Sequence, residues 1–182
     1  MSVAPPERIW WKPLGRTERL WVTLAVLWAM VLFFMMIVWG AAGKQDTPVE
    51  TYRTTPEQFG ALTDDFVKKY QVGTDKGVPV VAPPAGGDAF LRASRWTWYP
   101  VLELKKGQTY RIHLSSIDLQ HGFSLPQEVF SLNFQALPGY IYVVTLTPPE
   151  AGEFPVVCNE YCGIANEKIG HHSMVGKIVV KE

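Results

Sequence analysis

Near its C-terminal end the chain reads Cys158-Asn159-Glu160-Tyr161-Cys162-Gly163 and then, after six further residues, Gly170-His171-His172-Ser173-Met174-Val175-Gly176. These two segments contain both cysteines of the sequence, two of its four histidines and one of its five methionines. Thiolate, imidazole and thioether groups are ligands of soft or borderline metals, and copper uses all three. The concentration of these side chains predicts a metal site around which the chain is organised.

A further candidate ligand, His121, lies upstream in the segment DLQHGF. Cys158 and Cys162 are four positions apart, so their sulfurs can turn toward one point as a shared pair. His171 and Met174 stand in an H-x-x-M arrangement that can close the same site. The sequence therefore predicts one metal centre built from separate segments of the chain.

At these residues the sequence resembles subunit II of the haem-copper cytochrome c oxidases, and specifically its binuclear copper (CuA) domain. The family pattern is D-x-x-H-x-F, followed by C-x-[EQ]-x-C-G and then by G-H-x-x-M-x-G before a last strand. The resemblance runs from about Trp96 to Glu182, behind a single membrane anchor as in the B-type branch of the family. It implies a cupredoxin-like Greek-key β-barrel that holds two copper ions at its rim.

The resemblance also implies a role for each of the strongest ligands. Cys158 and Cys162 are expected to be the thiolates that bridge the two copper ions. His121 and His171 are expected to be the terminal imidazole ligands. Two copper ions that share two thiolates can delocalise one charge over both metals, which suits electron transfer.

Other residues receive weaker or supporting roles. The resemblance implies Met174 as the axial ligand of one copper and the backbone carbonyl of Glu160 as that of the other, with the Glu160 side chain free to reach a magnesium ion at the interface with subunit I. Asp118 is a candidate to hold the first imidazole, or else a surface carboxylate. Trp96 and Trp98 either pass electrons from a docked donor toward copper, as aromatic residues near this position do in the family, or simply pack the core.

The chain departs from the family pattern at one point. The family has its second histidine four residues after the second cysteine, whereas here the step from Cys162 to His171 is nine residues. The surplus corresponds to residues 165–169, and an insertion that bulges into water costs little because closure entropy grows slowly with loop length. The insertion leaves His172 as an alternative ligand. We favour His171 because it keeps the three-residue step to Met174 and directly follows a glycine.

Two cysteines have other common uses besides binuclear copper. Two cysteines in an oxidising compartment often form a disulfide. Zinc accepts these ligand types, but structural zinc sites rarely use methionine. A mononuclear blue-copper site needs one cysteine, which leaves Cys158 unexplained. The complete set of ligands in family order favours binuclear copper.

Composition indicates one domain with a membrane anchor. The net charge is zero and 47% of the residues are hydrophobic, which does not suggest a nucleic-acid partner or a disordered chain. Residues 20–43 contain no charged residue and are long enough to cross a hydrocarbon core of about 30 Å. Trp21 and Trp39 lie near the two ends, as interfacial aromatic residues do. A cleaved signal peptide would have an apolar region about half this long.

The charges before this span predict its orientation. Arg8, Lys12, Arg16 and Arg19 precede it, and the positive-inside rule keeps such a flank in the cytoplasm. Residues 1–19 are therefore expected to be a cytoplasmic tail of a single-pass protein in a bacterial or archaeal membrane, with the C-terminal domain periplasmic or otherwise extracytoplasmic. The span contains no histidine or acidic residue, so any haem is expected in a partner chain.

Residues 44–88 are expected to form a linker with a short amphipathic helix at 56–72. Thr55 is a good N-cap, with proline at the first helical position and Gln58 completing a capping box. Apolar residues then recur at helical spacing up to a stop at Gly73. This helix either lies on the membrane or a partner, or packs on its own domain. Residues 74–88 read as an extended connector with little regular structure.

From residue 89 to residue 182 the pattern indicates β-structure. Tyr110, Ile112 and Leu114 alternate with polar residues, as in a half-buried strand, and this alternation places His113 on the polar face as a solvated histidine. Further strand-like segments are residues 96–104, 140–146, 154–158 and 176–180. Short strands with turn signals between them predict an antiparallel sandwich or barrel.

The resemblance implies the electron-entry subunit of a terminal respiratory oxidase. Such a chain would accept electrons from cytochrome c or a small copper protein and pass them to haem in subunit I, where oxygen is reduced. The same module in a copper-containing nitric oxide reductase is the nearest alternative. A membrane-tethered copper chaperone is an alternative of another class, and so is a structural subunit in which the two cysteines form a disulfide.

Overall fold

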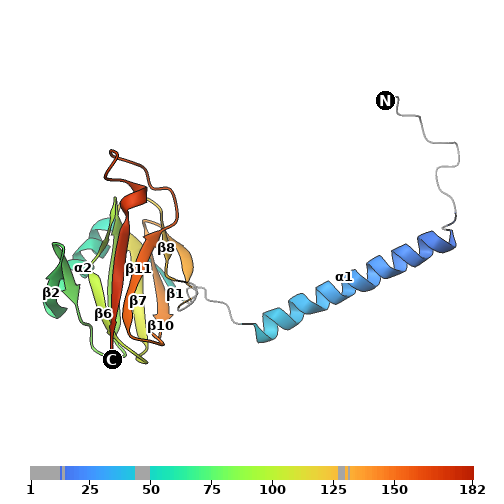
Figure 1. Ribbon diagram of the computed structural model, residues 1–182, viewed down its shortest axis with the longest axis horizontal. Helices are drawn as coiled ribbons and strands as arrows, with labels where there is room; N and C mark the ends of the chain where they lie inside the picture. The colour runs from blue at the N-terminus through green and yellow to red at the C-terminus, as the bar shows by residue number, and fades with distance from the viewer. Residues whose placement is uncertain (1–12, 14, 44–49, 127–129, 131) are drawn as a thin grey trace. The chain divides into compact units, whose positions relative to one another are not determined.

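The computed structural model describes residue 13 and residues 15–43, 50–126, 130 and 132–182 (Figure 1). The chain forms two compact units, Met1–Gln45 and Asp46–Glu182. Most of the expected cytoplasmic tail, including Arg8 and Lys12, lies outside the described residues, as do residues 44–49 of the expected linker. The two units are therefore considered one at a time.

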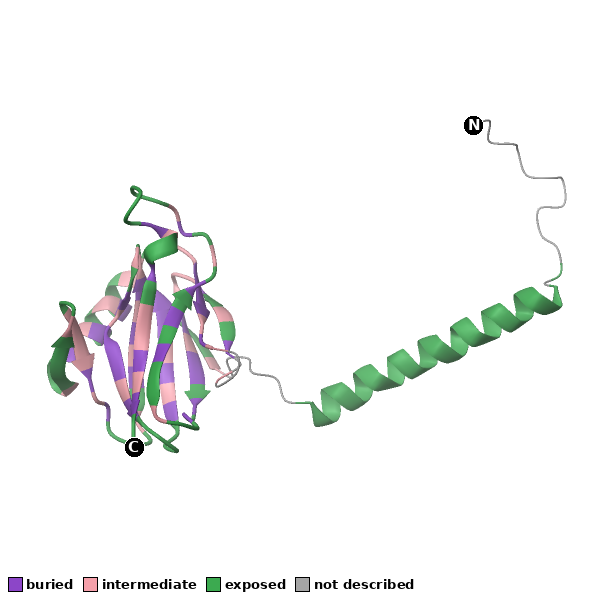
Figure 2. Ribbon diagram, in the orientation of Figure 1, coloured by how far each residue is buried: buried purple, intermediate pink, exposed green. Residues whose placement is uncertain are grey.

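The first unit contains one long apolar helix, α1 (Arg16–Ala42, 27 residues). Its mean hydropathy is 2.5 over the most apolar window, and none of its residues is buried in the protein (Figure 2). At 1.5 Å per residue the helix is about 40 Å long, which exceeds the hydrocarbon thickness of a bilayer. The sequence places the span at residues 20–43, and the helix begins one turn earlier, with Arg16 and Arg19 at its start. Its length and composition fit a membrane anchor.

The second unit is a two-sheet β-sandwich (Figure 1). One sheet has five strands in the order β1 (Glu50–Arg53), β10 (Tyr140–Leu146), β7 (Tyr110–Ser116), β4 (Asp88–Ser94) and β5 (Thr97–Tyr99). The other has seven in the order β2 (Gln71–Asp75), β3 (Val78–Val81), β6 (Val101–Lys105), β12 (Val175–Lys181), β11 (Gly152–Cys158), β8 (His121–Ser124) and β9 (Asn133–Ala136). A mainly β domain behind one apolar helix is the fold class that the sequence indicates.

Alternating side chains from the two sheets form the core between them. In β7 the residues Tyr110, Ile112 and Leu114 are fully buried, as their alternation predicts. Leu102 and Ile178, neighbours in the parallel pair of β6 and β12, are buried in the same cluster. Strands β8, β11 and β12 are neighbours in the seven-stranded sheet, and three of the candidate ligands lie at or next to the ends of these strands.

His113 differs from its expected solvated state. Its side chain is only 14% exposed, its ring stacks on Phe90 at 4.7 Å between centroids, and Nε2 lies 2.9 Å from Asp88 Oδ1. The alternation places it correctly on the outer face of β7, but the neighbouring strand β4 supplies a ring and a carboxylate that cover it. β7 and β11 belong to different sheets, and among the described residues the cysteines are grouped with His121 and not with His113.

Helix α2 (Pro56–Tyr70) packs on its own domain. Its N-terminus has the expected capping box, in which Thr55 Oγ1 accepts from the backbone N–H of Gln58. Phe59, Phe66 and Val67 on one face of the helix are buried against the sandwich. The sequence left open whether this helix lies on the membrane or a partner or packs on its own domain, and the structure shows that it packs on its own domain.

Residues 71–81 form two strands where the sequence indicates an irregular connector. β2 and β3 pair as a hairpin, and β3 continues the seven-stranded sheet by pairing in parallel with β6. Val81 is fully buried in the core, which explains why this valine-rich segment joins the sheet. Pro79 lies in β3 just before Val80 and Val81, the two residues that pair with β6, so it takes no part in that pairing. The β-domain thus begins well before residue 89, and residues 50–88 belong to the same compact unit.

Candidate metal centre

The candidate ligands meet at one end of the sandwich, at the upper end of the second unit in Figure 1. His121 is the first residue of β8, Cys158 is the last of β11, and Met174 immediately precedes β12. β11 pairs with both β8 and β12, so these three positions are fixed by the sheet itself. The remaining candidates lie in the loop between β11 and β12.

The two cysteines are free thiols that face each other. Their Sγ atoms are 3.8 Å apart, far longer than the bond of about 2.05 Å in a disulfide. With a metal–thiolate distance of about 2.3 Å, one ion can contact both sulfurs with an angle of about 110° at the metal. The pair therefore fits thiolates that share metal ions. Both residues are buried, with Cys158 3% and Cys162 2% exposed.

Each thiol has its own imidazole. His121 Nδ1 lies 3.8 Å from Cys158 Sγ, and His171 Nδ1 lies 3.7 Å from Cys162 Sγ. The ligand atoms of His121 and the two cysteines all lie within 4.8 Å of one another. Each histidine lies beside a different sulfur. The site therefore has two halves, which we call lobes: Cys158 with His121, and Cys162 with His171.

Each lobe also contains one weaker donor. The Sδ atom of Met174 lies 3.7 Å from Cys162 Sγ, and the backbone carbonyl oxygen of Glu160 lies 3.1 Å from Cys158 Sγ. One lobe is thus a thiol, an imidazole and a thioether, and the other is a thiol, an imidazole and a carbonyl. Six candidate ligands predicted from sequence are brought together in this pattern, and their role as copper ligands remains a prediction.

The geometry distinguishes the two adjacent histidines. His171 is half-buried and turned toward Cys162, whereas His172 is exposed and its Nε2 lies 3.1 Å from the carbonyl oxygen of Glu167. His172 therefore contacts the inserted loop and not the sulfur pair. His171, which the three-residue spacing to Met174 favours, is the histidine that faces the sulfur pair.

The additional residues 165–169 form an exposed loop that closes on itself. Ile164 and Gly170 form a β-bridge, and the N–H of Ala165 donates to the carbonyl of Ile169 at 2.9 Å. Below the bridge, the N–H of His171 donates to the carbonyl of Gly163 at 2.8 Å. The two ends of the loop are therefore adjacent, so the longer spacing in sequence does not move His171 away from Cys162.

Asp118 holds the first imidazole in place. Its Oδ1 lies 2.9 Å from His121 Nε2, while its Oδ2 accepts from the backbone N–H of Arg95 at 2.7 Å. Burial raises the pKa of Asp118, but hydrogen bonds from His121, Arg95 and Leu119 outweigh burial and keep the pKa below its ordinary value. Because a carboxylate only accepts, Nε2 carries the proton and Nδ1 faces Cys158 Sγ with a free lone pair. This is the tautomer that a metal needs.

The metal-free site keeps Cys162 protonated at neutral pH. Burial, together with the hydrogen bond and charge of the neighbouring Cys158, raises the pKa of the Cys162 thiol to about 12. Only the thiolate is a good ligand, so a metal that binds here must displace this proton. Metal uptake is therefore coupled to proton release.

The two tryptophans contact the site from different directions. Trp98 is 3% exposed, and its ring meets the rings of His121 and Phe123 edge-on at 6.4 and 5.5 Å. Trp96 is half-buried and its Nε1–H donates to the carbonyls of Gly163 and Cys162, at 2.9 and 3.3 Å. Both residues pack against the ligand shell, and a role in electron entry remains a prediction.

Strand β9 supplies two supporting residues that the sequence did not indicate. Asn133 Oδ1 accepts from Asn159 Nδ2 at 2.9 Å, and Gln135 Nε2 donates to Glu160 Oε1 at 2.9 Å. Gly122 in β8 faces the same segment so closely that a methyl group there would lie 1.9 Å from Asn159 Oδ1. No local pattern marks these residues, because their partners lie more than twenty positions away in the chain.

Part of the chain is similar to curated subunits of cytochrome c oxidases. It is 37% identical over 81 residues to a cytochrome c oxidase subunit 2 of Thermus thermophilus, a match that covers 44% of this chain and 55% of that protein. It is 31% identical over 80 residues to the alternative cytochrome c oxidase subunit 2 of Bradyrhizobium diazoefficiens, covering 44% of this chain and 26% of that protein. The chain spans about half, or less, of the length of these relatives. No protein-family model matches the chain.

Solved structures show the same likeness over more of the chain. One chain of a haem-copper terminal oxidase dimer aligns with a TM-score of 0.53 and 25% identity, covering 91% of this chain and 100% of that one. A variant of rusticyanin aligns with a TM-score of 0.50 and 18% identity, covering 75% of this chain and 100% of that one, and shows the fold alone. The cupredoxin-like fold and the resemblance to subunit II that the sequence indicated are confirmed.

Proposed function

We propose, from its similarity to subunit II of haem-copper cytochrome c oxidases, that this chain is the electron-entry subunit of a membrane-bound terminal oxidase. It accepts electrons at a binuclear copper centre from cytochrome c or a small copper protein. It passes them to haem in a catalytic partner subunit, where oxygen is reduced. The observation that carries the proposal is the pair of lobes around one shared pair of thiols.

The two-lobed arrangement supports two copper ions better than one. A four-coordinate mononuclear site leaves two of the six groups without a function, whereas two ions that shared both sulfurs would use all six. Cys158 and Cys162 would bridge the ions. His121 and the Glu160 carbonyl would complete one lobe, and the other lobe would take its imidazole and thioether from the segment before β12. Bound copper supplies a one-electron redox couple shared by both ions.

The protein's own contribution is to fix the positions of these ligands and to shield them from solvent. His121 and Met174 are 0% exposed, and strands β8, β11 and β12 fix the positions of three ligands through sheet pairing. Preorganised ligands change little between oxidation states, which keeps the barrier to electron transfer low. Asp118 adds to this by fixing the orientation and tautomer of His121.

The anchor and the partners follow from the same proposal. Helix α1 would cross the membrane with its N-terminal flank in the cytoplasm, so that the copper domain meets its donor on the extracytoplasmic side of a bacterial or archaeal cell. Trp96 and Trp98, which contact the ligand shell, are the candidate residues for electron entry. The Glu160 carboxylate, which accepts a bond from Gln135 through one oxygen, is the candidate for a magnesium ion at the interface with the catalytic subunit.

The decisive experiment is to load residues 44–182, which contain the compact unit Asp46–Glu182, with copper. We expect two copper ions per chain and a seven-line electron spin resonance pattern from one unpaired spin shared by two copper nuclei. Cys158→Ser and Cys162→Ser should each abolish this pattern. A single labile Cu(I) with no signal would indicate a copper chaperone instead, and no stoichiometric copper would indicate a structural subunit.

A further inference from the structure

Strands β11 and β12 present an exposed face of the seven-stranded sheet that is largely apolar. Their side chains pair across the two strands, and every second pair points away from the core. In one such pair Val157 lies opposite Val175, and these residues are 39% and 58% exposed. We call the six outward residues of the two strands the outer face: Glu153, Pro155, Val157, Val175, Lys177 and Val179. Four of the six are apolar.

The solvated face of an antiparallel pair normally carries polar side chains. The adjacent strand β6 follows this rule, since its outward residues include Glu103 and Lys105. On the five-stranded sheet, outward apolar residues are covered by α2, whose Phe59 packs against Ile141 and Val143. The outer face of β11 and β12 therefore has the composition of a covered surface, and exposed apolar groups of this kind indicate an interaction site.

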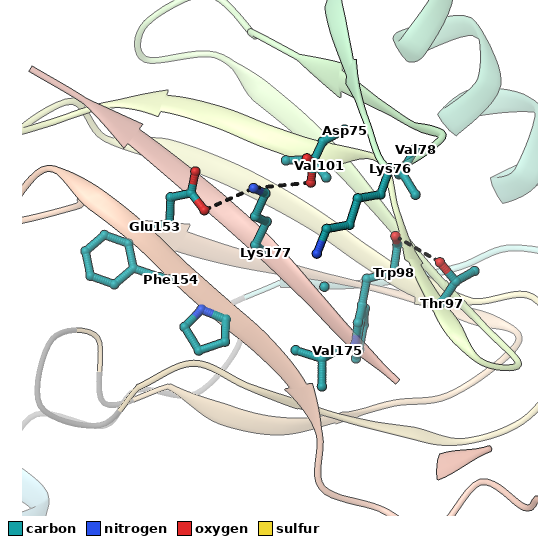
Figure 3. A pocket seen from close by; sticks show the side chains of 12 residues that line it. Asp75, Lys76, Val78, Thr97, Trp98, Val101, Glu153, Phe154, Val175 and Lys177 are labelled. Atoms are coloured by element: carbon teal, nitrogen blue, oxygen red, sulfur yellow. Dashed lines mark hydrogen bonds and ion pairs between the residues drawn. The ribbon is translucent and has the colours of Figure 1, made fainter. Parts of the chain in front are cut away.

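A groove of about 480 Å³ borders the outer face, between the β2–β3 hairpin and strands β11 and β12 (Figure 3). Lys177 lies between two carboxylates, with its Nζ 3.2 Å from Asp75 Oδ2 and 3.0 Å from Glu153 Oε2. The exposed Lys76 extends from the hairpin turn, on the side of Lys177 that lies away from Glu153 (Figure 3). Charges therefore alternate across the groove, and we call these four residues the charge row: Glu153, Lys177, Asp75 and Lys76.

The hairpin turn holds Lys76 beside the groove at a conformational cost. Its φ angle is 48°, in the left-handed region that asparagine and glycine enter more easily, and Gly77 follows with a φ of 86°. Backbone strain of this kind is often found where a side chain has a functional position. The positive end of the charge row is thus a specific feature of this turn.

An alternating row of four charges is complementary to its own copy. A two-fold axis through the middle of the row reverses its order, so that negative, positive, negative, positive faces positive, negative, positive, negative. Glu153 of one copy then faces Lys76 of the other, and Lys177 faces Asp75. Two-fold dimers use the same patch on both subunits, which requires this kind of self-complementarity.

The charge row also disfavours a strongly charged partner. It contains two positive and two negative groups, so it has no net charge with which to steer an oppositely charged protein from a distance. Its complementarity is short-range and fixes the orientation of a partner that has the same pattern. A second copy of this chain has that pattern, together with an equally apolar outer face.

We propose that two copies of this chain associate about a two-fold axis through the outer face and the charge row. The apolar residues of the outer face pack against those of the second copy, and the two charge rows pair with each other. Chains anchored in the same membrane meet at a high effective concentration, so a contact of modest size is sufficient. The inference goes beyond the proposed function and does not depend on a bound metal.

The test uses the full-length chain in mild detergent and measures its molar mass by sedimentation equilibrium over a range of concentrations. The variants Lys76→Glu and Glu153→Lys each reverse one end of the charge row. The matched control is Lys69→Glu, which reverses an exposed lysine of α2 outside the groove. Melting temperatures check that every variant is folded.

We expect the wild type to form a dimer and each reversal in the charge row to weaken dimerisation at least tenfold, because symmetry turns two attractive contacts into two repulsive ones. An equimolar mixture of Lys76→Glu and Glu153→Lys should recover the dimer. In the mixed pair the two reversed positions face each other, and so do the two native ones. The control should match the wild type.

The contrary results are equally definite. A monomeric wild type overturns the inference and leaves the outer face to a different polypeptide. A dimer that persists in both reversals also overturns it, since the copies would then meet elsewhere. Failure of the mixture to recover the dimer, or equal weakening in Lys69→Glu, would show that the two ends of the row do not face each other, with the same consequence. The electron spin resonance spectrum tests the proposed function separately.

Discussion

Replacing Gly122 by alanine should disturb the copper centre although Gly122 is not a ligand. This glycine lies in β8 against the segment between the two cysteines, and its carbonyl accepts from the N–H of Asn159 at 3.3 Å. A Cβ atom at this position would lie 1.9 Å from Asn159 Oδ1 and 2.7 Å from the backbone nitrogen of Glu160. The substitution therefore acts on the residue whose carbonyl is the proposed axial ligand.

The size of the disturbance follows from these two distances. The Asn159 side chain can rotate away, at the cost of its hydrogen bond to Asn133. The backbone of Glu160 has no such freedom, and restoring an ordinary contact of 3.4 Å from 2.7 Å moves it by about 0.7 Å. A functional site tolerates displacements of about 0.5 Å, so the carbonyl should leave its place beside Cys158. Overpacking of this kind also costs about 1–3 kcal/mol of folding free energy.

The assay compares Gly122→Ala with Gly73→Ala in copper-loaded residues 44–182. A methyl group at Gly73, in the edge strand β2, meets nothing within 4 Å. We expect Gly122→Ala to change the hyperfine pattern and lower the melting temperature, and Gly73→Ala to change neither. An unaltered spectrum and full copper stoichiometry in Gly122→Ala would refute the view that this close approach positions the Glu160 carbonyl.

Three other outcomes test the site. Asp118→Asn should weaken copper binding by about 10–100-fold in competition with a chelator, because the imidazole loses its charged partner, whereas the exposed Asp65→Asn should not. His171→Ala should abolish the binuclear spectrum and His172→Ala should leave it intact; the reverse would reassign the ligand. Since burial and the neighbouring thiol raise the pKa of Cys162 from 9.0 to about 12, the unfolded thiol ionises first as pH rises. Denaturant unfolding of the metal-free domain should therefore show stability falling above about pH 9, with a smaller fall in Cys162→Ser.

The cluster that the structure brings together could be predicted from sequence because most of its members are close in the chain and match a family pattern, and their role as ligands stays a prediction. Cys158 and Cys162 are close in the chain, and the step from His171 to Met174 is short enough to survive the insertion before it. The insertion also behaves as loop-closure entropy suggests, since its ends are tied by a bridge and the additional residues bulge outward. Candidate metal ligands that are close in sequence can thus be predicted before the fold is known.

The N-terminal half of the domain was harder to predict because tertiary packing decided it. The helical periodicity of α2 gave its existence and its start, but a buried face is equally apolar whether it meets a membrane or a sheet. The valine-rich segment 78–81 has a proline in it, which argues against a strand in isolation. Pairing with β2 on one side and with β6 on the other, together with the burial of Val81, makes it one.

The hydrogen bonds from β9 show why the residues that position the ligands cannot be predicted from the ligands alone. Gln135 and Glu160 are distant in sequence and meet only because β9 pairs with β8 and β8 pairs with β11. Glu160 therefore has two connections at once, since its carbonyl lies beside Cys158 while its carboxylate is held by Gln135. Truncating Gln135 would consequently release the carboxylate of the same residue whose carbonyl lies beside Cys158, so β9 supports the metal centre through Glu160.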